Sequence, residues 1–308
     1  MNSKAISFLT QNLTMNIAGN IFRNIWEQVE LATALPSFLK RNFSEHPEIR
    51  IHFQDPVKTV SVNSVINWHG WLSNNTTSIQ YLSMNWQHNQ NNFPNIQIDN
   101  IVDCKVIDNW ECDITQVDGM SCSKSRLRDF STLDALVEQD SKEMIEELSE
   151  AMLNKNLNHK GIGIIHHKNP VDYLSRHQWD GRIFLMNGDG SHHFAAAQYI
   201  AKRLKASYSI KGRLKEYSFN QEVINSLLSK YDLFVVNGNS SAFGHFSDIM
   251  KKFLAPYCRV SMPEPFTAMK LILLPKNKRR AMLVSSIMQK MNFFNLKTYF
   301  VKVMTQEH

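Results

Sequence analysis

Residues 182–204, RIFLMNGDGSHHFAAAQYIAKRL, contain the pattern that decides the fold of this sequence. The apolar run 182–186 predicts a buried strand, and the alanine-rich run 194–205 predicts a helix. In the turn between them, Gly188 and Gly190 permit backbone angles that other residues avoid, and Ser191 is expected to cap the helix. A strand that turns directly into a helix is typical of a sheet covered by helices.

Outside this stretch, apolar runs and periodic stripes predict further elements in both directions along the chain. Strands are expected at 161–165, 231–237, 271–274 and near 299–304, and helices at 131–155, 246–254 and 279–291. Residues 5–40 are predicted to be helical, with Pro36 ending or bending the helix, and 50–118 to form short strands such as 59–62. The Asn- and Gln-rich stretch 73–100 is predicted to be a surface loop.

These elements predict an α+β fold with a mixed sheet and helices. The chain has 308 residues, of which 43% are hydrophobic and 20% charged, so it can bury a sizeable core and is not disordered. Residues 1–150 carry 11 Lys and Arg against 19 Asp and Glu, whereas residues 151–308 carry the remaining 23 against 9. The net charges, −8 and +14, favour two regions: an N-terminal helical and β-rich region over 1–125, of unknown role, and a basic α/β domain over 126–308.

Cysteine spacing and hydropathy indicate the compartment. Four cysteines without a C-x-x-C pair are too few for a disulfide scaffold and do not match a structural zinc site. No stretch approaches 18 uninterrupted apolar residues, so no membrane partner is expected. We expect a cytoplasmic protein with reduced thiols.

The turn before the predicted helix 194–205 carries the clearest chemistry. Free N–H groups in the first turn of a helix, together with the positive end of its dipole, form a site for a phosphate or carboxylate. His192 and His193 lie where their side chains would reach the same ligand, and Asp189 adds a carboxylate. Lys202, Arg203 and Lys205 are too far along the helix and are expected to belong to a wider basic surface.

At Asp189-Gly190-Ser191-His192-His193, followed by Phe194 and three alanines, the sequence resembles the ParB/sulfiredoxin-like superfamily. Its members have a strand, a short D-G-x-H-R turn and an alanine-rich helix. The resemblance implies a nucleotide-binding core over about 130–215, with ATP or CTP, and Mg²⁺, at Gly188, Gly190, Ser191 and His193. Asp189 and His192 would be the catalytic residues of a phosphotransferase or hydrolase. Ser191 stands where sulfiredoxins have a catalytic Cys, and His193 where the usual Arg binds phosphate.

Two other classes of function stay open. Lys276, Lys278, Arg279 and Arg280 place four cations at the start of a predicted helix, where they oppose its dipole, and they suggest nucleic-acid contacts or a nuclease. A non-catalytic regulatory protein, whose acidic and basic halves pack together, is the third hypothesis.

A metal site is a further hypothesis on the same residues. His166 or His167 could combine with His192, His193 and Asp189, since imidazole and carboxylate suit several transition metals. No metal-binding motif supports this combination, so any metal is unknown.

Overall fold

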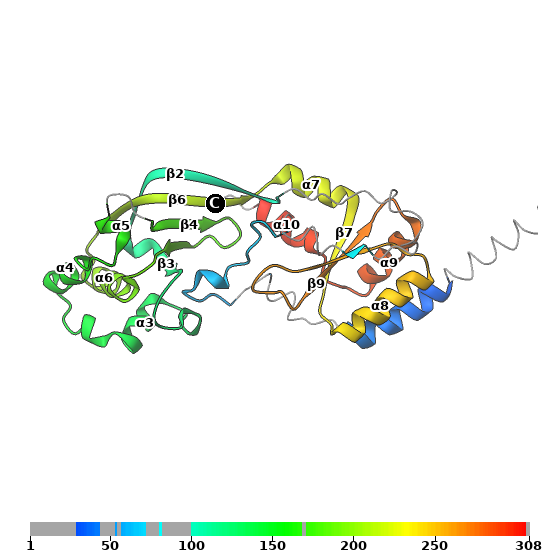
Figure 1. Ribbon diagram of the computed structural model, residues 1–308, viewed down its shortest axis with the longest axis horizontal. Coiled ribbons are helices and arrows are strands. Elements are labelled where there is room, and N and C mark those ends of the chain that lie inside the picture. The colour runs from blue at the N-terminus through cyan, green and yellow to red at the C-terminus, as the bar shows by residue number, and fades with distance from the viewer. Residues whose placement is uncertain are drawn as a thin grey trace, which may run out of the picture.

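The computed structural model describes residues 29–43, 53, 57–71, 80–81, 100–167 and 171–305, and these form an α+β protein (Figure 1). It contains a mixed five-stranded sheet and an antiparallel four-stranded sheet. The prediction of an α+β fold with a mixed sheet is confirmed.

The five-stranded sheet has the order β2-β6-β4-β5-β3. Its strands are β2 (Val102–Asp113), β3 (Val117–Met120), β4 (Tyr173–His177), β5 (Ile183–Met186) and β6 (Ser209–Phe219). Helices α3 (Leu133–Asp140), α4 (Glu150–Leu157) and α6 (Ser191–Leu204) gather on one side of it (Figure 1). Their apolar residues share one buried cluster with Leu174, Leu185 and Leu214 of the sheet, so this side holds the core.

The four-stranded sheet has the order β1-β8-β9-β7 and is covered on both faces. Its strands are β1 (Gln80–Tyr81), β7 (Tyr231–Val236), β8 (Cys258–Ser261) and β9 (Lys270–Pro275). Side chains alternate along β7, so that Leu233 and Val235 pack with α7 (Gln221–Lys230) and α10 (Leu296–Thr305). Phe234 and Val236 face the opposite way, toward α8 (Ser240–Lys252), α9 (Arg279–Lys290) and the helix over 29–42.

A single apolar cluster, which we call the inter-sheet core, joins the two sheets. It contains Val102 of β2 and Phe219 of β6 together with residues of β7, β8 and β9. Trp68 is fully buried in it, and its indole N–H donates to the Tyr299 hydroxyl at 3.4 Å. The five-stranded sheet itself combines β2 and β3 with three strands from beyond residue 126, so it includes chain from both sides of the division expected at 125.

Several predicted strands and helices agree with the structure, and three predicted strands, at 59–62, at 161–165 and near 299–304, are wrong. β5, β7, β9 and α9 lie where apolar runs or stripes predict them. A strand is predicted at 161–165, but the structure has the short helix α5 (Gly163–His166) there. Ile164 of this helix and Ile162 before it are buried. The strand expected near 299–304 is α10, because Leu296, Phe300 and Val303 recur at helical spacing and bury one face.

Other boundaries also differ from the sequence prediction. The helix expected over 131–155 is divided into α3, the 3₁₀ turn η5 (Lys142–Met144) and α4, with a break at Ser141. Residues 59–62 contain no strand but lead into the 3₁₀ turn η1 (Val62–Ser64). The helix over 29–42 passes through Pro36 and does not end there. The predicted helix before residue 29, and most of the predicted loop 73–100, lie outside the described residues.

The described residues contain neither a membrane-spanning helix nor a disulfide. Within the described ranges, no helix combines the length and the hydropathy needed to cross a bilayer. The four cysteines, all in described segments, form no disulfide.

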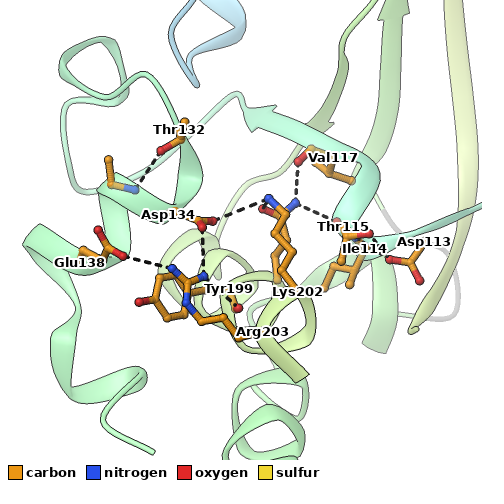
Figure 2. Close-up of polar contacts among 12 residues, drawn as sticks. Asp113, Ile114, Thr115, Val117, Thr132, Asp134, Glu138, Tyr199, Lys202 and Arg203 are labelled. Atoms are coloured by element: carbon orange, nitrogen blue, oxygen red, sulfur yellow. Dashed lines mark hydrogen bonds and ion pairs between the residues drawn. The ribbon is translucent and has the colours of Figure 1, made fainter. Parts of the chain in front are cut away.

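Helix α6 is fixed to its surroundings by polar contacts near its C-terminal end (Figure 2). The amide of Gln198, which is fully buried, donates to the carbonyls of Ile114 at 2.9 Å and Val117 at 2.6 Å. Arg203 pairs with Asp134 of α3 at 3.0 Å and Glu138 at 3.2 Å. Part of the acidic face of α3 therefore docks on cations that the sequence assigns to a free basic surface.

Replacing the buried amide should destabilise the protein far more than replacing the surface cation. Gln198→Ala removes two buried hydrogen bonds, to the Ile114 and Val117 carbonyls, and leaves a space in the core, and we expect a loss of about 2–4 kcal/mol in the free energy of unfolding. Arg203→Ala removes half-exposed ion pairs and should cost about 1 kcal/mol. Urea denaturation of both variants measures the difference, and equal losses would contradict this account.

Candidate functional site

The turn between β5 and α6 is held in place by the side chain of Asn187, which is buried. Its amide donates to the carbonyls of Cys122 at 3.1 Å and Asp189 at 3.0 Å, and its oxygen accepts the Cys122 N–H at 3.3 Å. On the other side, the Gly188 N–H donates to Asp172 at 3.1 Å. The turn is therefore fixed between β4 and the segment 121–126, which has the sequence SCSKSR.

Gly190 makes the entry into α6 possible. Its φ is +72°, in the left-handed region, and a Cβ there would lie 2.6–2.7 Å from backbone atoms of Gly161 and Ile162. Gly190 itself is the N-cap, and no side chain caps the helix. The expectation that Ser191 caps α6 is wrong: Ser191 is the first helical residue, and its hydroxyl donates to Ser123 at 3.1 Å.

His192, in the first turn of α6, is surrounded by serine hydroxyls from two other segments. Its Nε2 lies 3.2 Å from Ser123 Oγ and 3.2 Å from Ser125 Oγ, and its Nδ1 forms a short hydrogen bond with Ser141 Oγ. The Ser125 hydroxyl in turn donates to Asp140 at 2.5 Å. We call Ser123, Ser125, Ser141, Ser191 and His192 the serine-histidine cluster.

The hydrogens of this cluster can be assigned from the burial of Ser141. Ser141 is only 1% exposed, and among the described residues its hydroxyl bonds to His192 alone. It therefore donates to Nδ1, since otherwise a buried O–H would lack an acceptor. His192 then carries its hydrogen on Nε2 and donates toward Ser123 and Ser125.

The same accounting places Ser123 at the centre of the cluster. Its oxygen lies within hydrogen-bond distance of His192 Nε2, the Ser191 hydroxyl and the Ser125 N–H, the last at 3.2 Å. A hydroxyl oxygen has two lone pairs and cannot accept from all three at once, and the Ser123 and Ser191 hydroxyls can exchange donor and acceptor roles. Ser123 is half-exposed, so its hydroxyl can also turn toward a ligand oxygen.

His193 lies on another side of the same helix end. The amide nitrogen of Asn156 donates to the carbonyls of Met144 at 2.9 Å and Met152 at 3.1 Å, so its oxygen faces His193 Nδ1, at 3.0 Å. His193 therefore carries its hydrogen on Nδ1. Its ring stacks on that of His159 with centroids 3.8 Å apart.

Charge on the stacked pair is disfavoured by its surroundings. His159 Nδ1 accepts the Gly161 N–H at 3.2 Å, which requires a lone pair there. Burial, and then the proximity of His159 and His192, hold the pKa of His193 below its ordinary value, whereas Asp189 acts in the opposite direction. An anion bound nearby would favour protonation of His193.

The remaining polar groups at this end of α6 are exposed. Asp189 accepts the Gly190 N–H at 2.7 Å through one oxygen and is otherwise open to solvent. Exposed cations occupy the segments that form the site, with Lys124 between the two serines, Lys142 after Ser141, and Lys155 before Asn156. The carboxylates of Asp140, Asp172 and Asp189 also lie at this end of α6, so charges of both signs surround the helix end.

The structure does not bring the histidines together as a metal site. His166 Nε2 lies 2.7 Å from the Leu157 carbonyl. Among the described residues, no group of three or more His, Cys, Asp or Glu side chains is placed to hold a metal ion. The metal hypothesis on His166, His167, Asp189, His192 and His193 therefore has no geometric support in the described chain.

The cations proposed to contact nucleic acid lie in the other sheet and its helices. Lys276 donates to the Leu228 carbonyl at 2.6 Å and lies 3.4 Å from Asp232, and Arg280 donates to the Phe253 carbonyl at 2.7 Å. Lys278 and Arg279 are exposed. Lys276 and Arg280 therefore also stabilise the fold.

Sequence analysis missed the partners of His192. Ser123, Ser125, Asp140 and Ser141 lie 51 to 69 residues away from it along the chain. One signal was available: alternate serines at 121, 123 and 125 follow a strand without alternating apolar residues, as expected of a polar loop at a strand end.

The fold and site define the class of this protein: an α+β protein with a mixed five-stranded sheet and a polar cluster at the start of a helix. The chain belongs to a family of unknown function (DUF6685), whose pattern matches residues 107–308. That match covers every strand of the five-stranded sheet in whole or in part, as well as α6. No curated protein and no solved structure matches the sequence.

Substituting the two turn glycines should affect stability very differently. Gly190→Ala places a methyl group against backbone that cannot move independently, at a left-handed φ, and should cost about 3 kcal/mol or more. Gly188→Ala is the control, because nothing lies within 4 Å of its Cβ position, and it should change stability by less than about 0.5 kcal/mol. Thermal unfolding compares them, and a Gly190→Ala variant as stable as the control would disprove the close approach.

Proposed function

We propose that this protein binds a nucleotide, ATP or CTP with Mg²⁺, through its phosphates at the N-terminus of α6. The observation that carries the proposal is the gathering of His192 and three serine hydroxyls beside the N-terminal turn of α6, where backbone N–H groups are free. A phosphate oxygen is a strong acceptor, and the dipole of a 14-residue helix favours its negative charge.

We also propose a ParB/sulfiredoxin-like core made of β3 to β6 with α3, α4 and α6. In its favour, β5 runs into the turn Asp189-Gly190-Ser191-His192-His193 and then into an alanine-rich helix, as the resemblance implies. His193 takes the place of the usual phosphate-binding Arg, and His192 with the serines adds donors beside it.

The roles of the site residues follow from their positions. Gly188 leaves the turn open to a ligand, Gly190 lets α6 begin against the backbone of Gly161 and Ile162, and backbone N–H groups of Ser191, His192 and His193 would face the phosphate. Asp189 is exposed, and its second oxygen would hold Mg²⁺ together with phosphate oxygens, an arrangement that this ion favours. His192 is the acid–base group that a phosphotransferase or hydrolase would use.

Nucleotide binding should raise the melting temperature, and this rise should depend on His192. At a concentration 100 times Kd, ligand linkage amounts to about 2.7 kcal/mol, a shift of several degrees. His192→Ala should abolish most of the shift, whereas His245→Ala, which removes an exposed histidine of α8, should retain it. A thermal-shift series with ATP, CTP and Mg²⁺ measures this. Absence of any shift in the unaltered protein would refute nucleotide binding and favour a non-catalytic regulator.

Nucleotide affinity should increase as the pH falls from 7.5 to 6. The pKa of His193 is lowered in the free protein, so an anion that raises it takes up a proton on binding, and acid then favours the complex. In the unaltered protein, His193 should contribute a roughly three- to tenfold gain in nucleotide affinity between pH 7.5 and pH 6. His193→Gln retains a donor for Asn156 but does not titrate, so this variant should lack that gain. Calorimetric titration at both pH values, with His167→Gln as control, separates this effect from ionisation of the ligand; identical pH profiles for all three proteins would rule it out.

A further inference from the structure

The C-terminal end of α8 lies beside the N-terminal end of α9, and cations and exposed apolar side chains occupy this place. We call its six residues the α8–α9 tip: Lys251, Lys252, Leu254, Lys278, Arg279 and Met282. The two helices lie at the opposite end of the molecule from α6, so the tip is independent of the proposed nucleotide site (Figure 1).

The contacts of Arg280 bring the two halves of the tip together. Its guanidinium donates to the carbonyl of Phe253, between Lys252 and Leu254, at 2.7 Å. Met282 lies four residues after Lys278 and three after Arg279, so the three share one side of α9. All six residues of the tip are exposed.

The positive charge at the tip is not explained by helix stability. Lys278 is the N-cap of α9 and Arg279 its first residue, where cations oppose the helix dipole and no acidic residue offsets them. Lys252 pairs with Glu30, and Asp248 lies one turn before Lys251. In the described chain, Lys251, Lys278 and Arg279 form no ion pair, so the tip keeps a net positive charge.

The backbone angle and the exposure of Leu254 are also unfavourable for the stability of the fold. It has φ of +52°, in the left-handed region where a helix end favours glycine, and it is 47% exposed. Met282 is 44% exposed on the adjacent helix. Two protruding apolar side chains beside four cations match a partner that is anionic at its surface and apolar beneath it.

We propose that the α8–α9 tip binds the surface of a membrane containing anionic lipids. The cations would contact lipid phosphates and carboxylates, while Leu254 and Met282 insert among the headgroups. A nucleic acid would use the same cations but would gain little from Leu254. The leucine therefore distinguishes the two partners.

The test is co-sedimentation with vesicles, using the full chain and two sets of variants. The protein should bind phosphatidylcholine vesicles that contain about a third phosphatidylserine, and pure phosphatidylcholine at least about tenfold less. Lys278→Glu with Arg279→Glu should weaken binding at least about fivefold. The matched control is Lys297→Glu with Lys302→Glu, exposed cations of α10 with the same change in charge, and it should bind nearly as well as the unaltered protein.

Leu254→Gly supplies the decisive comparison. Glycine relieves the left-handed strain, so the melting temperature should rise by a few degrees while vesicle binding weakens several-fold. Three outcomes overturn the proposal: no binding to the anionic vesicles, equal losses for the two charge-reversed proteins, or unchanged vesicle binding by Leu254→Gly. Salt-sensitive binding to a DNA oligonucleotide, together with the last outcome, would assign the tip to nucleic acid instead.

Discussion

The close approach of Gly190 to the backbone of Gly161 and Ile162 is the constraint on which the site depends. It sets the point at which α6 begins and therefore the directions in which His192 and His193 leave the helix. Two consecutive residues on a helix point about 100° apart, so each histidine meets a different segment. His192 reaches the serines of the loop after β3, and His193 reaches α4 and His159.

The sequence predicts those elements of the fold in which the local residue pattern alone distinguishes a helix from a strand. β7 and β9 each contain a continuous apolar run of four residues, and α9 has an apolar stripe of helical period, so none of the three needs tertiary context. The strand predictions for 161–165 and 299–304 were wrong because short runs of isoleucine, valine and aromatic residues suit a strand and a buried helix equally. In both cases the decision lies with neighbours far along the chain: the cluster that buries Ile162 and Ile164 with Cys112 and Ile210, and the inter-sheet core around Phe300.

The candidate site also has one part that the sequence predicts and one part that it does not. The turn, its glycines and its two histidines could be recognised because they are contiguous, and the position of the turn between a strand and a helix agrees with the structure. The serine partners could not, since a hydroxyl has no pattern of its own and Ser141 is placed only by the break between α3 and η5. That break falls within a stretch of good helix formers, where local preference predicts continuity.

The inter-sheet core has a consequence for cooperativity. Val102 and Phe219 stand at paired positions at one end of the β2–β6 ribbon, and both are buried against residues of the four-stranded sheet. If either sheet opened, the apolar surface of the other would be exposed to water, so partial unfolding at this boundary carries a large hydrophobic cost. The chain should consequently respond to heat or denaturant as one unit, and damage to one sheet should be felt in the other.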